Sequence, residues 1–431
     1  MHVVRAGGGA LSDEDLGRYR AELRAWISRN LPPRPPGADL RAAHDITPER
    51  LREERGKQRA LHAAGYVGIT VPEEYGGQGL TQEHQRVWLE ESSAFAVPAP
   101  GGIASHVTLG IVLPTLLVHA SEDQKRRWIP RILSGEEIWV QLLSEPGAGS
   151  DLAGLLTRAT RDGDAWVLNG TKVWSSGAMA ADFGICLART DWDAPKHRGL
   201  TWFKVPLHDP QVTVRPIREI NGSAEFCEEF LDDVTVGPDM VIGEVGGGWP
   251  IANHMLAVER GAGAAQSAGM ATRERTLAPD LVALAKARGL ERNTATRQLI
   301  AKAHINDYMQ AELTQRVGGA IAVGKADPTS ASLIKLGIGV RDPLRAALAM
   351  EIGGRAAIAW PAAARDGSAA AINFLNGRIY SIAGGSNQIQ RNIISERLLG
   401  MPREPSTDSD KPFREVLRDA QRWGAREPRD S

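Results

Sequence analysis

The stretch IWVQLLSEPGAGSDLAGLLTRATRDGDAWVLNGTKVWSSGA, residues 138–178, marks the point at which the character of the chain changes. Helical periodicity gives way to short runs of β-branched and aromatic residues that are separated by Gly, Asp and Asn. Asp162-Gly163 and Asn169-Gly170 both have the composition of a hairpin turn. We therefore predict a compact β domain of antiparallel type over residues 138–245. Further strands are expected in the runs DFGICLAR (182–189), LTWFKVP (200–206) and VTVRPIR (212–218).

On both sides of this stretch the apolar residues recur at helical spacing. Residues 1–137 are expected to form an N-terminal α-helical domain, and residues 246–403 a C-terminal four-helix bundle. A polar tail, residues 404–431, follows, with one short helix expected around Phe413. The fold class is therefore α+β. The helical segments predicted upstream are 16–27, 48–64, 81–95, 107–119 and 122–133; those of the bundle are 250–287, 294–318, 327–360 and 368–377.

Composition excludes several classes of protein. Of the 431 residues, 51 are basic and 52 acidic, and this balance argues against a nucleic-acid binder or a polybasic membrane-surface protein. The longest stretch without charged residues, Ser92–Ser121, is broken by prolines and glycines, so no membrane span is expected. Two cysteines and ten histidines without ligand spacing indicate neither a disulfide framework nor a metal site. No targeting segment is visible, and we expect a cytoplasmic protein.

Two glycine clusters and one tryptophan are the candidate binding features. The run Ser144–Asp151 can bring backbone N–H groups close to a phosphate or a flat cofactor, although a tight turn explains it equally well. The run Ile382–Arg391 places a glycine pair before a helix, which suits a cofactor or simply an ordinary capped helix. Trp174 beside two serines can stack on an aromatic ring, although a strand tryptophan is more often part of the core.

Taken together, these motifs resemble the acyl-CoA dehydrogenase family over residues 11–405. The motifs that carry the resemblance are EEYGGQGL (73–80), EDQKRRWIPRILSGE (122–136), QLLSEPGAGSDL (141–152), LNGTKVWSSGA (168–178) and GGSNQIQRNIISERLLGMPR (384–403). The resemblance implies a tightly bound FAD between the β domain and the bundle. It also implies α,β-dehydrogenation of an acyl-CoA thioester, in which a carboxylate removes the Cα proton and a hydride leaves Cβ for flavin N5.

The resemblance assigns the cofactor-binding residues position by position. Leu143 and Ser144 are expected at the pyrimidine side of the flavin, and Trp174 and Ser176 at its dimethylbenzene and N5 side. Further contacts are expected from Gly149, Ser150, Ser386 and Gln388. Of these, Ser150 lies by the phosphates of the cofactor or by the thioester ligand.

The catalytic base is expected at an alternative position. Many family members carry the base immediately before the Gly-Thr/Ser of the last motif, where this chain has Gly384. A minority place it on the first helix of the bundle, where this chain has Glu259-Arg260. We predict Glu259 as the base, Arg260 as a contact to CoA, and the Gly384 N–H as half of an oxyanion hole. Without the resemblance, a helical Glu-Arg pair is more often a solvated surface.

Electron-transferring flavoprotein is the electron acceptor that the resemblance implies, and a homo-oligomer, dimer or tetramer, is the assembly. The family's Arg-x-x-Phe-Gly segment, which reaches the partner subunit's FAD, is missing from residues 283–300. A hetero-oligomer, with this chain as a non-catalytic or FAD-sharing subunit, therefore stays open. A third reading on the same fold is an oxygen-using oxidase or monooxygenase.

Overall fold

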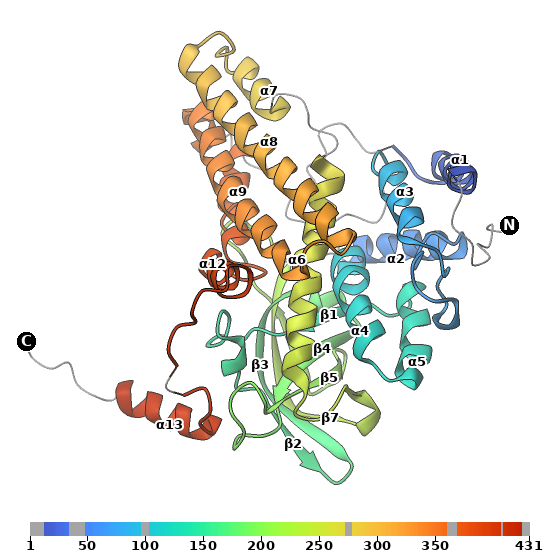
Figure 1. Cartoon of the computed structure of the whole chain (residues 1–431), viewed down its shortest axis with the longest axis vertical. Helices are drawn as coiled ribbons and strands as arrows, with labels where there is room; N and C mark the ends of the chain where they lie inside the picture. Colours follow the sequence, from blue (N-terminus) through green and yellow to red (C-terminus); the bar gives the residue numbers. More distant parts are fainter. Residues whose placement is uncertain are drawn as a thin grey trace, which may run out of the picture.

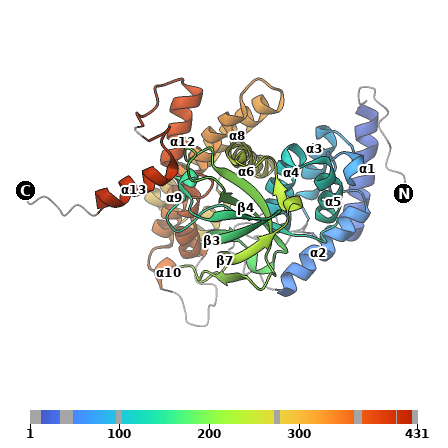
Figure 2. The same ribbon diagram turned by 90° about the horizontal axis from the view of Figure 1, so that it is seen from below.

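The computed structural model describes residues 13–33, 48–95, 103–271, 278–359, 369–406 and 408–424. Helices come first, an eight-stranded sheet follows and helices return, which confirms the predicted order. Figure 1 shows the N-terminal helices beside the sheet, and the long helices of the bundle rising above it. Seen from below in Figure 2, the sheet lies between these two helical parts.

The N-terminal helices form largely where the apolar periodicity predicts them. Helix α5 begins at the capping box of Ser121 and Gln124, and its apolar face, which includes Trp128 and Ile132, is buried. The predicted 107–119 helix differs, because its first part is the π-helix η2 and only its end is α-helical. Pro114 lacks the N–H that would bond the carbonyl of residue 110, and this favours the wider turn. The helices are α1 (Asp13–Asn30), α2 (Pro48–Ala63), α3 (Gln82–Ser92), η2 (Ile103–Val112), α4 (Leu113–His119) and α5 (Glu122–Leu133).

The sheet is mixed, so the prediction of an antiparallel domain is wrong in one part. Strands run in the order β6-β7-β3-β2-β4-β5-β8, and β1 pairs with β4. The β1–β4 pair and the β2–β4 contact are parallel. The β2–β3 hairpin lies between β1 and β4 in the chain, and parallel pairing needs such a long connection. The strands are β1 (Trp139–Leu142), β2 (Arg158–Asp162), β3 (Ala165–Ser176), β4 (Phe183–Arg189), β5 (Leu200–Pro206), β6 (Val212–Pro216), β7 (Phe226–Val236) and β8 (Val241–Ile242).

Of the two predicted hairpin turns, one is confirmed and one is wrong. Asp162-Gly163 joins β2 to β3, as expected. Asn169-Gly170 instead lies inside β3, at an irregularity in the pairing with β7. The side chain of Asn169 forms two hydrogen bonds with Asp233 in β7. These bonds satisfy the polar group of Asn169, so this residue, which suggested a turn, is accommodated within the strand.

Strand β7 was not among the predicted strands. Its sequence, FCEEFLDDVTV, is rich in Glu and Asp, which are depleted in strands. Alternate side chains of its first half, Cys227, Glu229 and Leu231, are nevertheless buried.

The C-terminal helices form the predicted bundle, in which α6, α8, α9 and α11 pack together. Helix α6 also contacts α4 and β5, so it joins the bundle to both other parts. The tail carries the predicted short helix, α13. The helices are α6 (Gly248–Ala271), α7 (Pro279–Ala287), α8 (Thr294–Ala322), α9 (Ala331–Gly353), α10 (Arg355–Ile358), α11 (Ala369–Asn376), α12 (Asn387–Ile393) and α13 (Phe413–Gly424). Among the described residues, no helix is long and apolar enough to cross a membrane.

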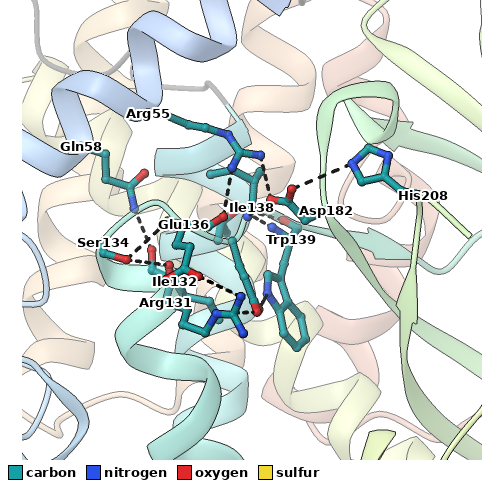
Figure 3. Close-up of polar contacts among 12 residues, drawn as sticks. Arg55, Gln58, Arg131, Ile132, Ser134, Glu136, Ile138, Trp139, Asp182 and His208 are labelled. Carbon is teal, nitrogen blue, oxygen red and sulfur yellow. Dashed lines mark hydrogen bonds and ion pairs between the residues drawn. The ribbon is translucent and has the colours of Figure 1, made fainter.

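Side chains of helix α2 connect the N-terminal helices to the start of the sheet through hydrogen bonds and an ion pair (Figure 3). Arg55 donates to the carbonyl of Glu136 at 3.0 Å and to Asp182 at 2.7 Å. The same oxygen of Asp182 accepts the N–H of Ile138, at 2.7 Å. Gln58 donates to the last carbonyls of α5. The junction between α5 and β1 is thus fixed just before the glycine-rich segment.

Candidate active site

The first glycine-rich segment is a tight loop that a buried ion pair holds in place. Glu145 accepts the N–H groups of Leu156 and Thr157 at 2.5 and 2.8 Å, and its carboxylate lies 2.9 Å from the ammonium of Lys172. Lys172 also donates to the carbonyl of Leu143 at 3.1 Å. Although burial acts to raise it, Lys172 and these N–H groups hold the pKa of Glu145 below its ordinary value.

The exposed part of this loop leaves space beside its glycines. An added Cβ at Gly147 or Gly149 would meet no atom within 4 Å. Ser144 is half-buried and its carbonyl accepts the N–H of Val173 at 2.9 Å, so the loop lies next to β3. Gly149 and Ser150 are exposed. The backbone of the loop at these two glycines is therefore not covered by other parts of the described chain.

Trp174 lies at an irregularity of β3 that turns its side chain outward. Its φ is 69°, the pairing with β7 shifts between Val173 and Ser175, and its side chain is 57% exposed. Positive φ is strained for a bulky residue and points to a functional constraint. Ser175 is buried and donates to Glu229 at 2.9 Å, which anchors the neighbouring residue of the strand. Ser176 is half-buried at the end of β3.

The second glycine-rich segment is a turn with two consecutive left-handed residues, Gly384 (φ 65°) and Gly385 (φ 91°). The buried side-chain amide of Gln390 donates to both of their carbonyls, at 2.9 and 3.3 Å. Ser386 caps α12 by accepting the N–H of Ile389 at 3.3 Å. Gln388 is exposed on the first turn of that helix.

Glu259 and Gly384, which the sequence predicts as a complementary pair, lie together. A Cβ built on Gly384 would stand 3.2 Å from Oε1 of Glu259 and 3.3 Å from Cε of Lys335. Gln141, in β1, donates to Oε2 of Glu259 at 3.5 Å. The carboxylate thus occupies the space that a side chain at position 384 would need.

The electrostatic surroundings of Glu259 suit a proton acceptor. Burial raises the pKa of Glu259, while Gln141, Arg260 and Lys335 act in the opposite direction. Burial lowers the pKa of Arg260 and of Lys335. Lys335 donates to the carbonyl of Tyr380 at 2.7 Å, which ties α9 to the glycine turn.

Three residues that lie against Glu259 or the glycine turn were not singled out from the sequence: Gln141, Lys335 and Gln390. Gln141 opens the motif QLLSEPGAGSDL (141–152) and Gln390 lies in the last motif (384–403), so a signal existed for these two. Lys335 has no local signal, because only the packing of α9 brings it to Gly384. Ser150 is exposed and Arg260 follows Glu259 on α6, and the roles predicted for these two and for the other site residues stay predictions.

The residues fit a flat, partly anionic cofactor of the kind that the resemblance implies. Trp174 offers an exposed indole face, and the loop at Gly147 and Gly149 has open space beside its backbone. Leu143, Ser144 and Ser176 lie on the neighbouring backbone, and Ser386 and Gln388 on the bundle. In the part of the chain that the structure describes, no three or more His, Cys, Asp or Glu side chains are grouped so that they could hold a metal ion.

Three family models match the chain in order: acyl-CoA dehydrogenase N-terminal domain over residues 13–136, middle domain over 141–234 and C-terminal domain over 246–399. The chain is 35% identical to the acyl-CoA dehydrogenase IpdE1 of Mycobacterium tuberculosis, over 91% of this chain and 99% of that protein. Its fold matches the solved Tcur3481-Tcur3483 steroid ACAD with a TM-score of 0.74 and 30% identity, over 91% and 99% of the two chains. It also matches the ChsE4-ChsE5 complex from Mycobacterium tuberculosis with a TM-score of 0.66 and 25% identity, over 92% and 99%.

Proposed function

The chain belongs to the acyl-CoA dehydrogenase family, and from this premise we propose that it oxidises a bulky acyl-CoA thioester to the trans-2-enoyl-CoA, with Glu259 as the base. The observation that carries the proposal is that the carboxylate of Glu259 lies next to Gly384, 3.2 Å from where a Cβ at that position would be. An acid stands where a side chain at position 384 would reach, so the base is supplied from α6 instead.

The chain's own residues can perform the proton abstraction. Glu259 removes the Cα proton, and its buried surroundings bring its pKa toward the working range of a general base. Negative charge then develops on the thioester oxygen. The Gly384 N–H can donate to that oxygen, because the turn is pinned through its carbonyls by Gln390.

FAD, when bound, supplies the acceptor for the hydride that leaves Cβ. Leu143, Ser144, Gly149, Ser150, Trp174 and Ser176 would hold it from the β domain, and Ser386 and Gln388 from the bundle. Arg260 would contact the CoA part of the substrate. Gln141 would orient the carboxylate of Glu259 through its hydrogen bond, and the nearby charge of Lys335 would favour the ionised form.

The substrate class and assembly are supported by the named relatives. A solved relative is described as a steroid ACAD, which favours a ring-bearing acyl group here. A second relative is a complex of two named chains, which supports a hetero-oligomer as the alternative to a homo-oligomer. We propose electron-transferring flavoprotein as the acceptor and the cytoplasm as the location. Two free, buried thiols fit a reducing compartment.

The test is anaerobic bleaching of the bound flavin by a panel of straight, branched and steroid-type acyl-CoA thioesters. The wild-type protein should be yellow and should bleach fastest with a ring-bearing thioester. Glu259→Gln should keep the flavin and lose bleaching by roughly a hundredfold or more. Glu351→Gln, an exposed acid on α9, is the matched control and should behave like wild type.

Three results would overturn parts of this proposal. Bleaching by Glu259→Gln at the wild-type rate removes Glu259 as the base. A colourless wild-type protein that becomes yellow and active only with a second chain supports the FAD-sharing subunit. Stoichiometric peroxide in air, without need of another acceptor, supports the oxidase.

A further inference from the structure

The C-terminal helix α13 lies on the middle domain, outside the residues that the family models match. Its first residues bind the loop that joins β4 to β5. Phe413 and Arg414 donate their N–H groups to the carbonyls of Ala194 and Trp192, both at 3.0 Å. Pro412 forms a bridge with Pro195 in the same loop. These contacts attach the start of the helix to the β domain.

Phe413 is the anchor of this attachment, and it covers a buried cation. The ring is 2% exposed, and its centroid lies 3.8 Å from the guanidinium carbon of Arg189. Arg189 is itself fully buried, and burial lowers its pKa to about 10. In the described part of the chain, no salt bridge involves Arg189. The face of an aromatic ring attracts a cation, so Phe413 compensates part of the lost hydration.

Arg189 in turn binds the backbone that directly follows the first glycine-rich segment. Its Nη2 donates to the carbonyl of Ala153 at 2.6 Å and to that of Lys196 at 3.1 Å, and its Nε donates to Leu155 at 3.4 Å. Lys196 lies 3.0 Å from both carboxylate oxygens of Asp151. Two successive contacts therefore connect α13 to the residues that follow Gly149 and Ser150.

The chain between the bundle and α13 starts close to the second glycine-rich segment and ends on the domain that carries the first. Residues 399–412 follow the helical turns that come after Gly384, which end at Leu398, and they lead directly to Phe413. In Figure 1 this part of the chain runs from α12 down to α13, beside the sheet. One continuous segment thus links the bundle half of the candidate site to the β half.

We propose that residues 399–424 act as a strap, in which Phe413, as a positioning residue, orders the loop 144–157 for cofactor binding. The inference rests on the proposed function for the identity of the cofactor, FAD. The ordering of the loop does not depend on it. Loss of the aromatic ring removes its attraction for the buried guanidinium of Arg189 and leaves the more distant ring of Trp192, at 5.7 Å, so the hydrogen bonds of Arg189 to Ala153 and Leu155 weaken. The loop that bears Ser150 then opens more often.

The experiment compares the full-length wild-type protein with Phe413→Leu, Phe413→Tyr and Arg414→Ala. Leucine fills the site without a ring, and tyrosine keeps the ring. Arg414 forms an exposed ion pair with Asp193 and serves as the control from the same helix. Hydrogen exchange of residues 151–157 is measured on the protein as purified, with β7 as the internal reference. The dissociation constant for FAD is measured separately.

Phe413→Leu should raise the exchange rate of residues 151–157 on the order of tenfold and weaken FAD binding by a similar factor. β7 should be unchanged. Phe413→Tyr and Arg414→Ala should match wild type in both measurements. Wild-type exchange of residues 151–157 in Phe413→Leu would overturn the strap, as would an equal loss in Phe413→Tyr. A wild-type protein that binds no FAD contradicts the proposed function instead, and the exchange measurement still decides the strap.

Discussion

At the scale of single residues, the central feature of the candidate site is the carboxylate of Glu259, which lies where a side chain at position 384 would extend. The sequence predicts Glu259 and Gly384 as a complementary pair, and their side-chain positions meet in the structure. The surrounding groups are less predictable. Lys335 contributes a positive charge from α9, which carries no family motif. Its place beside the glycine turn is known only from the structure, in which its ammonium donates to the carbonyl of Tyr380. The family resemblance predicts the proposed base, whereas the charged and polar groups around it come from tertiary packing.

Lys335 should set the pH range in which Glu259 accepts a proton. Its positive charge favours the carboxylate form, so removing it should raise the pKa of Glu259 further. We expect Lys335→Met to shift the acidic limb of the kcat/KM profile to higher pH. Lys335→Arg keeps the charge and should move that limb much less. An unchanged limb in Lys335→Met would contradict the electrostatic role.

Glu229 should make the protein less stable as pH rises. Burial raises its pKa to about 8, so the folded state keeps a proton that the unfolded chain releases above roughly pH 4.3. The stability is therefore fully present at low pH and is lost progressively up to pH 8. Glu229→Gln should remove this dependence. Its gain in the free energy of unfolding should grow from pH 5 to 8, to on the order of a few kcal/mol, and then stay constant.

Urea unfolding at pH 5, 7 and 9 measures this gain. A gain that is the same at all three values would show that Glu229 is ionised throughout.

At the scale of elements, the periodic helices and the β2–β3 hairpin follow from the sequence, whereas β7 and the parallel pairing do not. The acidic residues of β7 obscure its alternation, and one of them, Glu229, is buried against Ser175. Asn169-Gly170 has the composition of a turn, but tertiary pairing with Asp233 keeps it in the strand. Pairing partners that are distant in the chain decide these cases, and no local pattern encodes them.

Glycine at position 170 is required by close packing between strands. A Cβ there would lie 2.4 Å from Oγ1 and 2.7 Å from Cα of Thr157. Gly170→Ala should therefore destabilise the protein by about 1–3 kcal/mol. Gly318→Ala, in α8 with nothing within 4 Å, should be neutral or stabilising by up to about 1 kcal/mol. Thermal unfolding compares the two, and equal melting temperatures would refute the packing argument.

At the scale of the whole molecule, the site exists only where three parts of the chain meet. Gln141 comes from β1, Glu259 from α6 and Gly384 from the turn before α12. The helical–β–helical order was predictable, but the contacts among the parts were not. Arg55 in α2, for example, forms an ion pair with Asp182, and no sequence pattern around either residue predicts this pair.

Arg55 should contribute measurably to holding the N-terminal helices on the sheet. Its ion pair with Asp182 is largely shielded from water, and its loss leaves the carboxylate with fewer donors. We expect Arg55→Ala to lower the free energy of unfolding by about 1–3 kcal/mol. Arg52→Ala removes an exposed pair with Glu49 on the same helix and should cost less than about 1 kcal/mol. Equal losses would contradict the proposed junction.

The most direct test of the account is exchange of the Cα proton of a bound thioester with solvent. The probe is a 3-thia-acyl-CoA, in which sulfur replaces Cβ, so that no hydride can leave and only proton abstraction is measured. In deuterated water the wild-type holoenzyme and Glu351→Gln should incorporate deuterium at Cα, as followed by NMR. Glu259→Gln should be slower by at least about a hundredfold. Incorporation at the wild-type rate in Glu259→Gln would contradict the assignment of Glu259 as the base.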